Sequence, residues 1–125
     1  EFSLFDFWLH QDIYQGDEVQ ELLNKIRNRY SVIEPPQYNK FQNGFSHIFA
    51  GGYSAGYYSY KWAEVMSADA FFECIKDEQI DSQKALGYKQ NILHNGASKN
   101  MSRLYKQWLH KDFEVDSLLK LYGLK

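Results

Sequence analysis

Several residue types are scarce in this chain of 125 residues, and each scarcity excludes a class of structure. The only cysteine is Cys74, so the sequence excludes an internal disulfide framework and a zinc site built from cysteines. Threonine is absent, and valine and isoleucine together number only eleven. Because strands favour β-branched side chains, this composition favours helices. No apolar run reaches the roughly 18 residues that a membrane-spanning helix needs, and no signal-peptide pattern is present, so we expect no membrane partner.

Neither sign of charge dominates the sequence. Fourteen basic and sixteen acidic residues give a formal net charge of −2 and a pI near 6.1, which argues against a nucleic-acid partner. Hydrophobic residues make up 44%, enough for a packed core, and aromatic residues make up 18%, with ten tyrosines and nine phenylalanines. The length predicts a single domain, or part of one, over residues 1–125.

The spacing of apolar residues predicts an all-α, multihelical fold. Residues 1–10 place Phe2, Phe5 and Trp8 on one helical face. Asp17 is expected to cap a helix of about thirteen residues, and Pro35-Pro36 to form an extended connector. Further helices are predicted over residues 53–75, 81–93, 101–109 and 114–122, with Asp81 and Asn100 as caps and Gly123 after the last helix.

The predicted helix over residues 53–75 differs from the others because it is apolar nearly all round. Such a pattern indicates a long buried helix rather than a surface one. Lys61 and Glu64 lie on it at i, i+3, and we expect these two charges to pair.

A glycine-rich segment precedes this helix, with Gly51 and Gly52 at its centre. This segment, residues 41–56, is predicted to form a loop. Tyr53, Tyr57 and Tyr60 follow at i, i+4 and i+7, and His47 lies just before the two glycines. Phenols are protonated at neutral pH, so two or three of them beside a mobile loop could stabilise an oxyanion. On spacing alone, ordinary packing of the tyrosines and a structural role for His47 are the more common explanations.

Metal-binding motifs are absent from the sequence itself. None of the four histidines belongs to a His-Glu-x-x-His or His-x-x-x-His pattern. His110 and Glu114 are four residues apart, but the residues between them indicate a turn between helices, which makes a metal site there improbable. No phosphate-binding loop is present.

The block of residues 45–64 is more specific. Its sequence, FSHIFAGGYSAGYYSYKWAE, resembles the C-terminal signature of the thimet oligopeptidase family, with the bacterial oligopeptidase A branch most similar. The resemblance extends over essentially the whole chain, through segments upstream and downstream of that block: residues 4–10, 36–41, 67–71, 96–99 and 115–119.

This resemblance implies a zinc-dependent metalloendopeptidase that hydrolyses short peptides in a channel between two mostly helical halves. Its zinc ligands, two histidines of a His-Glu-x-x-His helix and a later glutamate, have no counterpart in this chain. We therefore expect no metal bound by these residues alone, zinc being the cofactor of a full-length parent. A cytoplasmic location also follows from the resemblance.

The resemblance further implies roles for individual residues. Tyr60 matches the tyrosine that donates to the scissile carbonyl oxygen, and Tyr53 and His47 match groups that face the substrate. Tyr57 matches a tyrosine that lines the cleft. Gly51 and Gly52 match glycines that let the loop close over a bound peptide.

The first residue is Glu1, not methionine, and the first predicted helix has no cap before it. We therefore expect the chain to be the C-terminal part of a longer peptidase whose N-terminal part is its partner, and to be inactive alone. Exposure of Phe2, Phe5 and Trp8 would then promote self-association. The alternative is a stand-alone helical module that binds peptides or a protein without catalysis.

Overall fold

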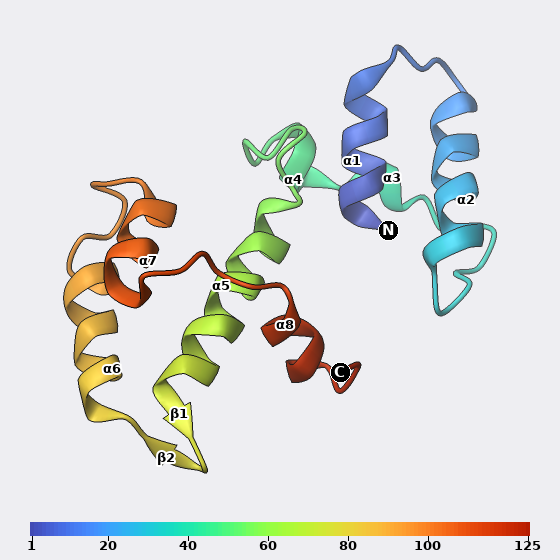
Figure 1. The fold of residues 1–125 in the computed structure, drawn as a ribbon. Helices are drawn as coiled ribbons and strands as arrows, with labels where there is room; N and C mark the ends of the chain where they lie inside the picture. The colour runs from blue at the N-terminus through green and yellow to red at the C-terminus, as the bar shows by residue number, and fades with distance from the viewer. The chain divides into compact units, whose positions relative to one another are not determined.

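The computed structural model describes residues 1–125 and confirms the all-α, multihelical fold: eight α-helices are accompanied by one minimal hairpin (Figure 1). The chain divides into two compact units, Glu1–Tyr60 and Lys61–Lys125. No helix combines the length and the hydropathy needed to cross a membrane.

The first unit is built on two helices that lie side by side, α1 (Phe2–Gln11) and α2 (Glu18–Tyr30) (Figure 1). The short helices α3 (Phe41–Gly44) and α4 (Ser46–Phe49) follow, so the prediction of a loop over residues 41–56 is wrong for its first part. One hydrophobic core joins these elements through the buried side chains of Phe5, Leu22, Leu23, Ile26, Phe45 and Ile48. The expected exposure of three aromatic residues on α1 is confirmed for Phe2 and Trp8 and is wrong for Phe5, which is fully buried.

The second unit contains most of α5 (Ser59–Cys74) and all later elements. After the hairpin of β1 (Ile75–Lys76) and β2 (Gln79–Ile80) come α6 (Ser82–Tyr88), the π-helical segment η1 (Lys89–Leu93), α7 (Met101–Leu109) and α8 (Asp116–Leu121). Two of the predicted caps are confirmed, because Asp81 accepts from the Gln83 and Lys84 amides and Asn100 accepts from the Arg103 amide. The third is wrong, since the side chain of Asp17 makes no capping hydrogen bond to α2. The predicted Lys61–Glu64 pair forms at 2.7 Å.

Burial of α5 is one-sided rather than complete. Val65, Ala68 and Ala70 are buried, whereas Trp62 and Phe71 remain exposed. The buried charge on this helix, Asp69, accepts hydrogen bonds from the hydroxyls of Tyr105 and Ser117, both at 2.6 Å. Burial and the hydrogen bond to Asp69 raise the pKa of Tyr105 above its ordinary value. This hydrogen-bonded group connects α5, α7 and α8.

The hairpin between α5 and α6 was not predicted from the sequence. Ile75 pairs with Ile80, and Lys76 pairs with Gln79. The two residues of its turn, Asp77 and Glu78, both have positive φ, which is the geometry of a type I′ turn. Glutamate is an unusual residue for that conformation, so the sequence carries no clear turn signal here.

Candidate functional site

The loop that follows α4 begins with a tight turn over His47. The amide of Tyr53 donates to the carbonyl oxygen of His47 at 3.0 Å, which closes the turn. A Cβ atom at Gly51 would lie 2.9 Å from that same carbonyl oxygen. Gly52 adopts φ +78°, in the left-handed region that favours glycine. Both glycines of the predicted loop are therefore required by its backbone geometry.

The long helix begins at Ser59 and not near Tyr53, so one part of the sequence prediction is wrong. Residues 54–58 form turns, and Ala55 has a left-handed φ of 52° that no continuous helix accommodates. Of the three tyrosines, only Tyr60 lies on α5. Helical periodicity is therefore not what relates Tyr53 and Tyr57 to Tyr60.

The three tyrosine rings nevertheless come together with His47. The ring of Tyr60 has its centroid 5.2 Å from that of Tyr53 and 5.1 Å from that of Tyr57. The imidazole of His47 lies 5.7 Å from the ring of Tyr57 and 6.3 Å from those of Tyr53 and Tyr60. We call these four residues the tyrosine cluster.

The tyrosine cluster is both anchored and accessible. Phe45, which belongs to the core of the first unit, packs edge-on against Tyr57 with a centroid separation of 4.9 Å. On the other side, Tyr53 is 37% exposed and Tyr60 is 41% exposed, and His47 is also exposed. A ligand in solvent can therefore reach the polar groups of the cluster.

The surroundings of Tyr60 favour the protonated form of its phenol. A hydrogen-bonding interaction with the Tyr53 side chain is the main cause that raises the pKa of Tyr60 above its ordinary value, and desolvation acts in the same direction. A phenol with a raised pKa is neutral throughout the physiological range and donates its proton to an acceptor. The site thus offers neutral donors beside an imidazole, a combination suited to an oxygen that gains negative charge.

One residue that supports the site was missed by the sequence analysis. The carboxylate of Asp6, fully buried on α1, accepts from the amides of Ala55 and Tyr57, both at 2.9 Å. A charged residue between Phe5 and Phe7, on a helix that buries Phe5, was the signal in the sequence, because a buried carboxylate needs partners. Its partners lie about fifty positions along the chain, so the sequence did not reveal them.

Residues of this chain do not form a metal site. No three side chains of His, Cys, Asp or Glu lie together in a way that could hold an ion. His110 ends α7 in a left-handed conformation and Glu114 follows in the connection to α8, so the pair does not share a helical face. A zinc ion does not fit the donors that this chain supplies.

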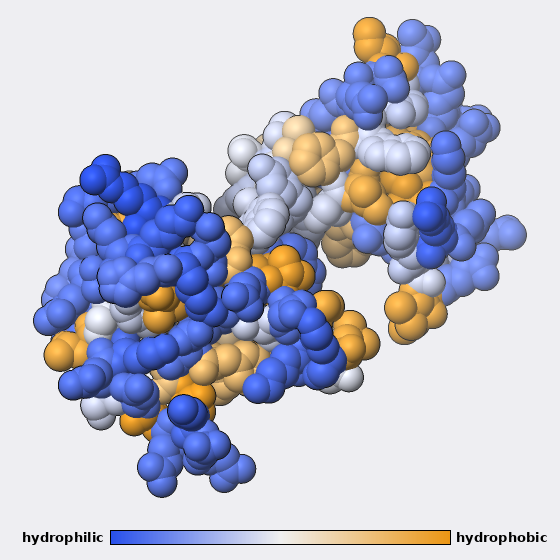
Figure 2. All heavy atoms as spheres, in the orientation of Figure 1, coloured by the Kyte–Doolittle hydropathy of each residue, from blue (hydrophilic) through white to orange (hydrophobic).

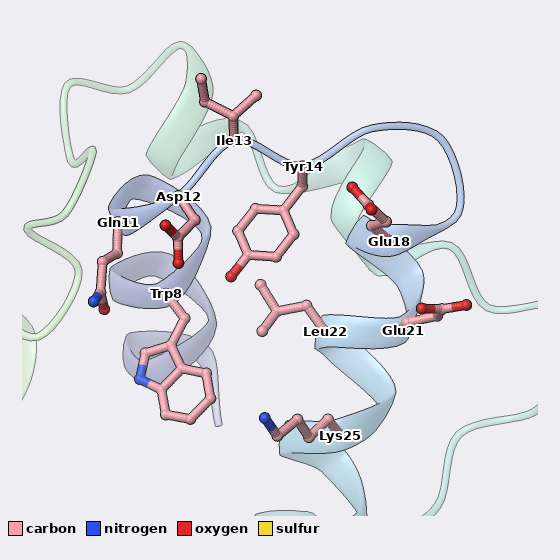
Figure 3. Close-up of a pocket in the computed structure, with 9 residues that line it drawn as sticks. All are labelled: Trp8, Gln11, Asp12, Ile13, Tyr14, Glu18, Glu21, Leu22 and Lys25. Atoms are coloured by element: carbon pink, nitrogen blue, oxygen red, sulfur yellow. The ribbon is translucent and has the colours of Figure 1, made fainter.

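A cavity lies elsewhere in the first unit, between α1 and α2 (Figure 3). It has a volume of about 580 Å³ and shares no residue with the tyrosine cluster. Its lining combines the aromatic side chains of Trp8 and Tyr14 with the acidic side chains of Asp12, Glu18 and Glu21. The ammonium group of Lys25 lies 5.0 Å from the centroid of the Trp8 ring and so covers one aromatic surface that a ligand would use.

Comparison with known proteins places this chain in a family. The model of peptidase family M3 matches residues 1–124. Oligopeptidase A of Salmonella typhimurium and that of Escherichia coli are each 39% identical to the chain over 127 residues, which covers 100% of this chain. The "Probable cytosolic oligopeptidase A" of Arabidopsis thaliana is 36% identical over 130 residues, or 98% of the chain. The chain spans 18–19% of the length of these relatives. It belongs to peptidase family M3.

Proposed function

We propose that this chain is the C-terminal part of a zinc-dependent oligopeptidase of family M3 and supplies the groups that bind the scissile peptide bond. The observation that carries the proposal is the tyrosine cluster: three phenol side chains and an imidazole converge at an accessible site. Family membership supports peptide hydrolysis as the reaction. Such donors stabilise the carbonyl oxygen as it becomes an oxyanion.

Each member of the site has a distinct role in this proposal. Tyr60 is the principal donor, since its exposed ring lies at the centre of the cluster, 5.2 Å from that of Tyr53 and 5.1 Å from that of Tyr57. Tyr53 donates a second hydrogen bond to the same carbonyl oxygen and holds Tyr60 in position. His47 and Tyr57 contact the peptide substrate along the cleft, and Gly51-Gly52 form the hinge through which the loop closes over it.

Zinc belongs to the full-length parent in this proposal, because the donors of this chain do not fit it. When bound there, zinc polarises the substrate carbonyl and activates water. The residues of this chain bind the peptide, orient its carbonyl group and donate hydrogen bonds to the carbonyl oxygen. We therefore expect residues 1–125 alone to show no hydrolysis, because they hold only one side of the site.

Short peptides are the proposed substrates, in line with the printed names of the oligopeptidase relatives. A cytoplasmic location is proposed on the same basis, since one relative is named as cytosolic. The N-terminal part of the same polypeptide is the proposed partner of this chain.

The decisive experiment is the substitution Tyr60→Phe in the full-length, zinc-loaded polypeptide. Loss of one oxyanion donor lowers kcat by roughly a hundredfold or more. KM for a short quenched-fluorescence peptide should change little, because the lost contact strengthens only in the transition state. An unchanged kcat would refute the role of Tyr60.

Tyr58→Phe is the matched control. Tyr58 lies two residues before Tyr60, but its ring stacks on Phe7 at 5.1 Å and takes no part in the tyrosine cluster. The kcat of this variant should stay within about twofold of that of the unmodified enzyme, since hydroxyl loss away from the site leaves the transition-state contacts in place.

Peptide binding without any hydrolysis by the unmodified, zinc-loaded protein would instead support a binding module.

A further inference from the structure

We propose that Asp6 is the positioning residue of the tyrosine cluster. Its carboxylate holds the backbone of residues 55 and 57 and thereby fixes the three tyrosines relative to His47. The catalytic consequence rests on the function proposed above, whereas the contact itself does not.

Both oxygens of the Asp6 carboxylate accept hydrogen bonds from the loop. The Ala55 amide donates to Oδ1 and the Tyr57 amide donates to Oδ2, each at 2.9 Å. The Nδ1 atom of His10, one turn later on α1, lies 3.0 Å from Oδ1. The side chain of Asp6 is fully buried, and a buried carboxylate is stable only when its oxygens accept such bonds. The Asp6 carboxylate therefore needs the hydrogen bonds from the loop amides in order to remain buried.

The loop depends on this acceptor in turn. Residues 54–58 lie between α4 and α5 and lack the regular hydrogen bonds of a helix. Ala55 adopts a left-handed conformation, which is unfavourable for a residue with a Cβ atom and persists only where surrounding contacts enforce it. The hydrogen bond from its amide to Asp6 is such a contact.

The two amides that Asp6 binds lie between the tyrosines in the sequence, which explains why Asp6 affects the tyrosine cluster. Tyr57 is itself clamped through its amide, Tyr53 lies two residues before Ala55, and Tyr60 lies three residues after Tyr57. A backbone shift at residues 55 and 57 would therefore move all three rings. Misplacement by about 1 Å can cost roughly a hundredfold in rate.

The test uses Asp6→Ala in the full-length, zinc-loaded polypeptide, with Asp12→Ala as control. Asp12 is an exposed carboxylate at the end of the same helix, outside the tyrosine cluster. Asp6→Ala should lower kcat roughly a hundredfold with a smaller change in KM. Hydrogen exchange measured by mass spectrometry should accelerate in the segment 53–60. Asp12→Ala should change neither quantity, and unchanged exchange in Asp6→Ala would overturn the proposal.

A double-mutant cycle separates positioning from general destabilisation. If Asp6 acts through the tyrosines, Asp6→Ala should cost much less kcat in a Tyr60→Phe background than in the unmodified enzyme. An equal loss in both backgrounds would assign Asp6 a merely structural role and overturn the proposal. Should the alanine variant fail to fold, Asp6→Asn keeps the volume and one acceptor oxygen, and the same measurements apply.

The two proposals fail separately. If Tyr60→Phe alone leaves kcat unchanged, the proposed function falls, while exchange in the segment 53–60 still decides whether Asp6 holds the loop. If Tyr60→Phe lowers kcat but Asp6→Ala changes neither kcat nor exchange, only the positioning role is lost.

Discussion

At Gly51 even a single added methyl group would collide with the backbone of the site. The His47 carbonyl oxygen would lie 2.9 Å, and the His47 Cα atom 3.0 Å, from a Cβ atom at this position. Real Cβ atoms do not approach backbone atoms so closely, so one of the two segments must move. Because His47 belongs to the tyrosine cluster, any such movement reaches the site.

Gly51→Ala should therefore lower kcat/KM of the full-length enzyme more than it lowers global stability. We expect a loss of roughly ten- to a hundredfold, because a misplaced donor costs transition-state binding. Steady-state kinetics and urea unfolding measure the two effects. Gly44→Ala is the control, since nothing lies within 4 Å of a Cβ atom there. Equal kinetics for the two variants would contradict the assigned packing at Gly51.

At this scale the sequence predicted the identity of the clustered residues but not the reason they cluster. Tyr53, Tyr57 and Tyr60 were placed together by helical periodicity, whereas the structure brings them together through a turn. The left-handed Ala55 could not be anticipated, because it is held by Asp6, a tertiary contact between distant residues. The catalytic roles of these residues stay predictions.

Among the elements of the second unit, α7 is held to α5 by one buried hydrogen bond. The Tyr105 hydroxyl donates to Asp69 at 2.6 Å, and both side chains are buried. Asp69 also accepts from Ser117 on α8 and lies 3.7 Å from the ammonium group of Lys111. The carboxylate thus depends on three neighbours for the solvation that water would otherwise provide.

Tyr105→Phe should destabilise the protein by about 1–3 kcal/mol, since it leaves a buried carboxylate with one partner fewer. Urea unfolding of the full-length polypeptide measures the loss of stability. Hydrogen exchange in α7, measured separately, shows whether the loss is local to that helix. Tyr88→Phe removes a hydroxyl from the same hydrophobic cluster and should cost less, because the Tyr88 ring keeps its packing on Trp108. A smaller loss for Tyr105→Phe than for Tyr88→Phe would refute this account.

Elements with strong local signals were predicted closely. The helix after Asp17 has the thirteen residues expected, and both side-chain caps formed at Asp81 and Asn100 were identified. Elements that depend on tertiary contacts were missed, namely the start of α5 at Ser59 and the hairpin with its turn at Asp77 and Glu78. Local propensity and periodicity determine the former group, whereas packing decides the latter.

Across the whole molecule, large apolar side chains remain at the surface. Val32 is 98% exposed and Ile33 is 81% exposed, in the connection that follows α2. Figure 2 shows hydrophobic atoms reaching the surface in both units. Exposed apolar area of this kind marks interaction surfaces in soluble proteins. The rest of a longer polypeptide would cover such surfaces, in keeping with the small share of its relatives that the chain spans.

Residues 1–125, produced alone, should therefore self-associate. Light scattering after size exclusion should give a mass that rises above 14.8 kDa as the concentration increases. Replacing Val32 and Ile33 with serine should weaken the association, because it removes exposed apolar area. Exposed Lys99→Ser serves as the polar control. A constant monomer mass at all concentrations would refute the prediction, and so would an effect of Lys99→Ser equal to that of the apolar variants.

The bonds that Asp6 makes to the loop have a consequence for protein engineering. Both donors are main-chain amides, so these hydrogen bonds do not depend on which side chains stand at residues 55 and 57. Aromatic replacements at Tyr57 would therefore keep the attachment of its amide to Asp6 and the packing of its ring on Phe45. Such a set of variants would show how much the chemistry of this side chain matters while the backbone of the loop stays fastened to α1.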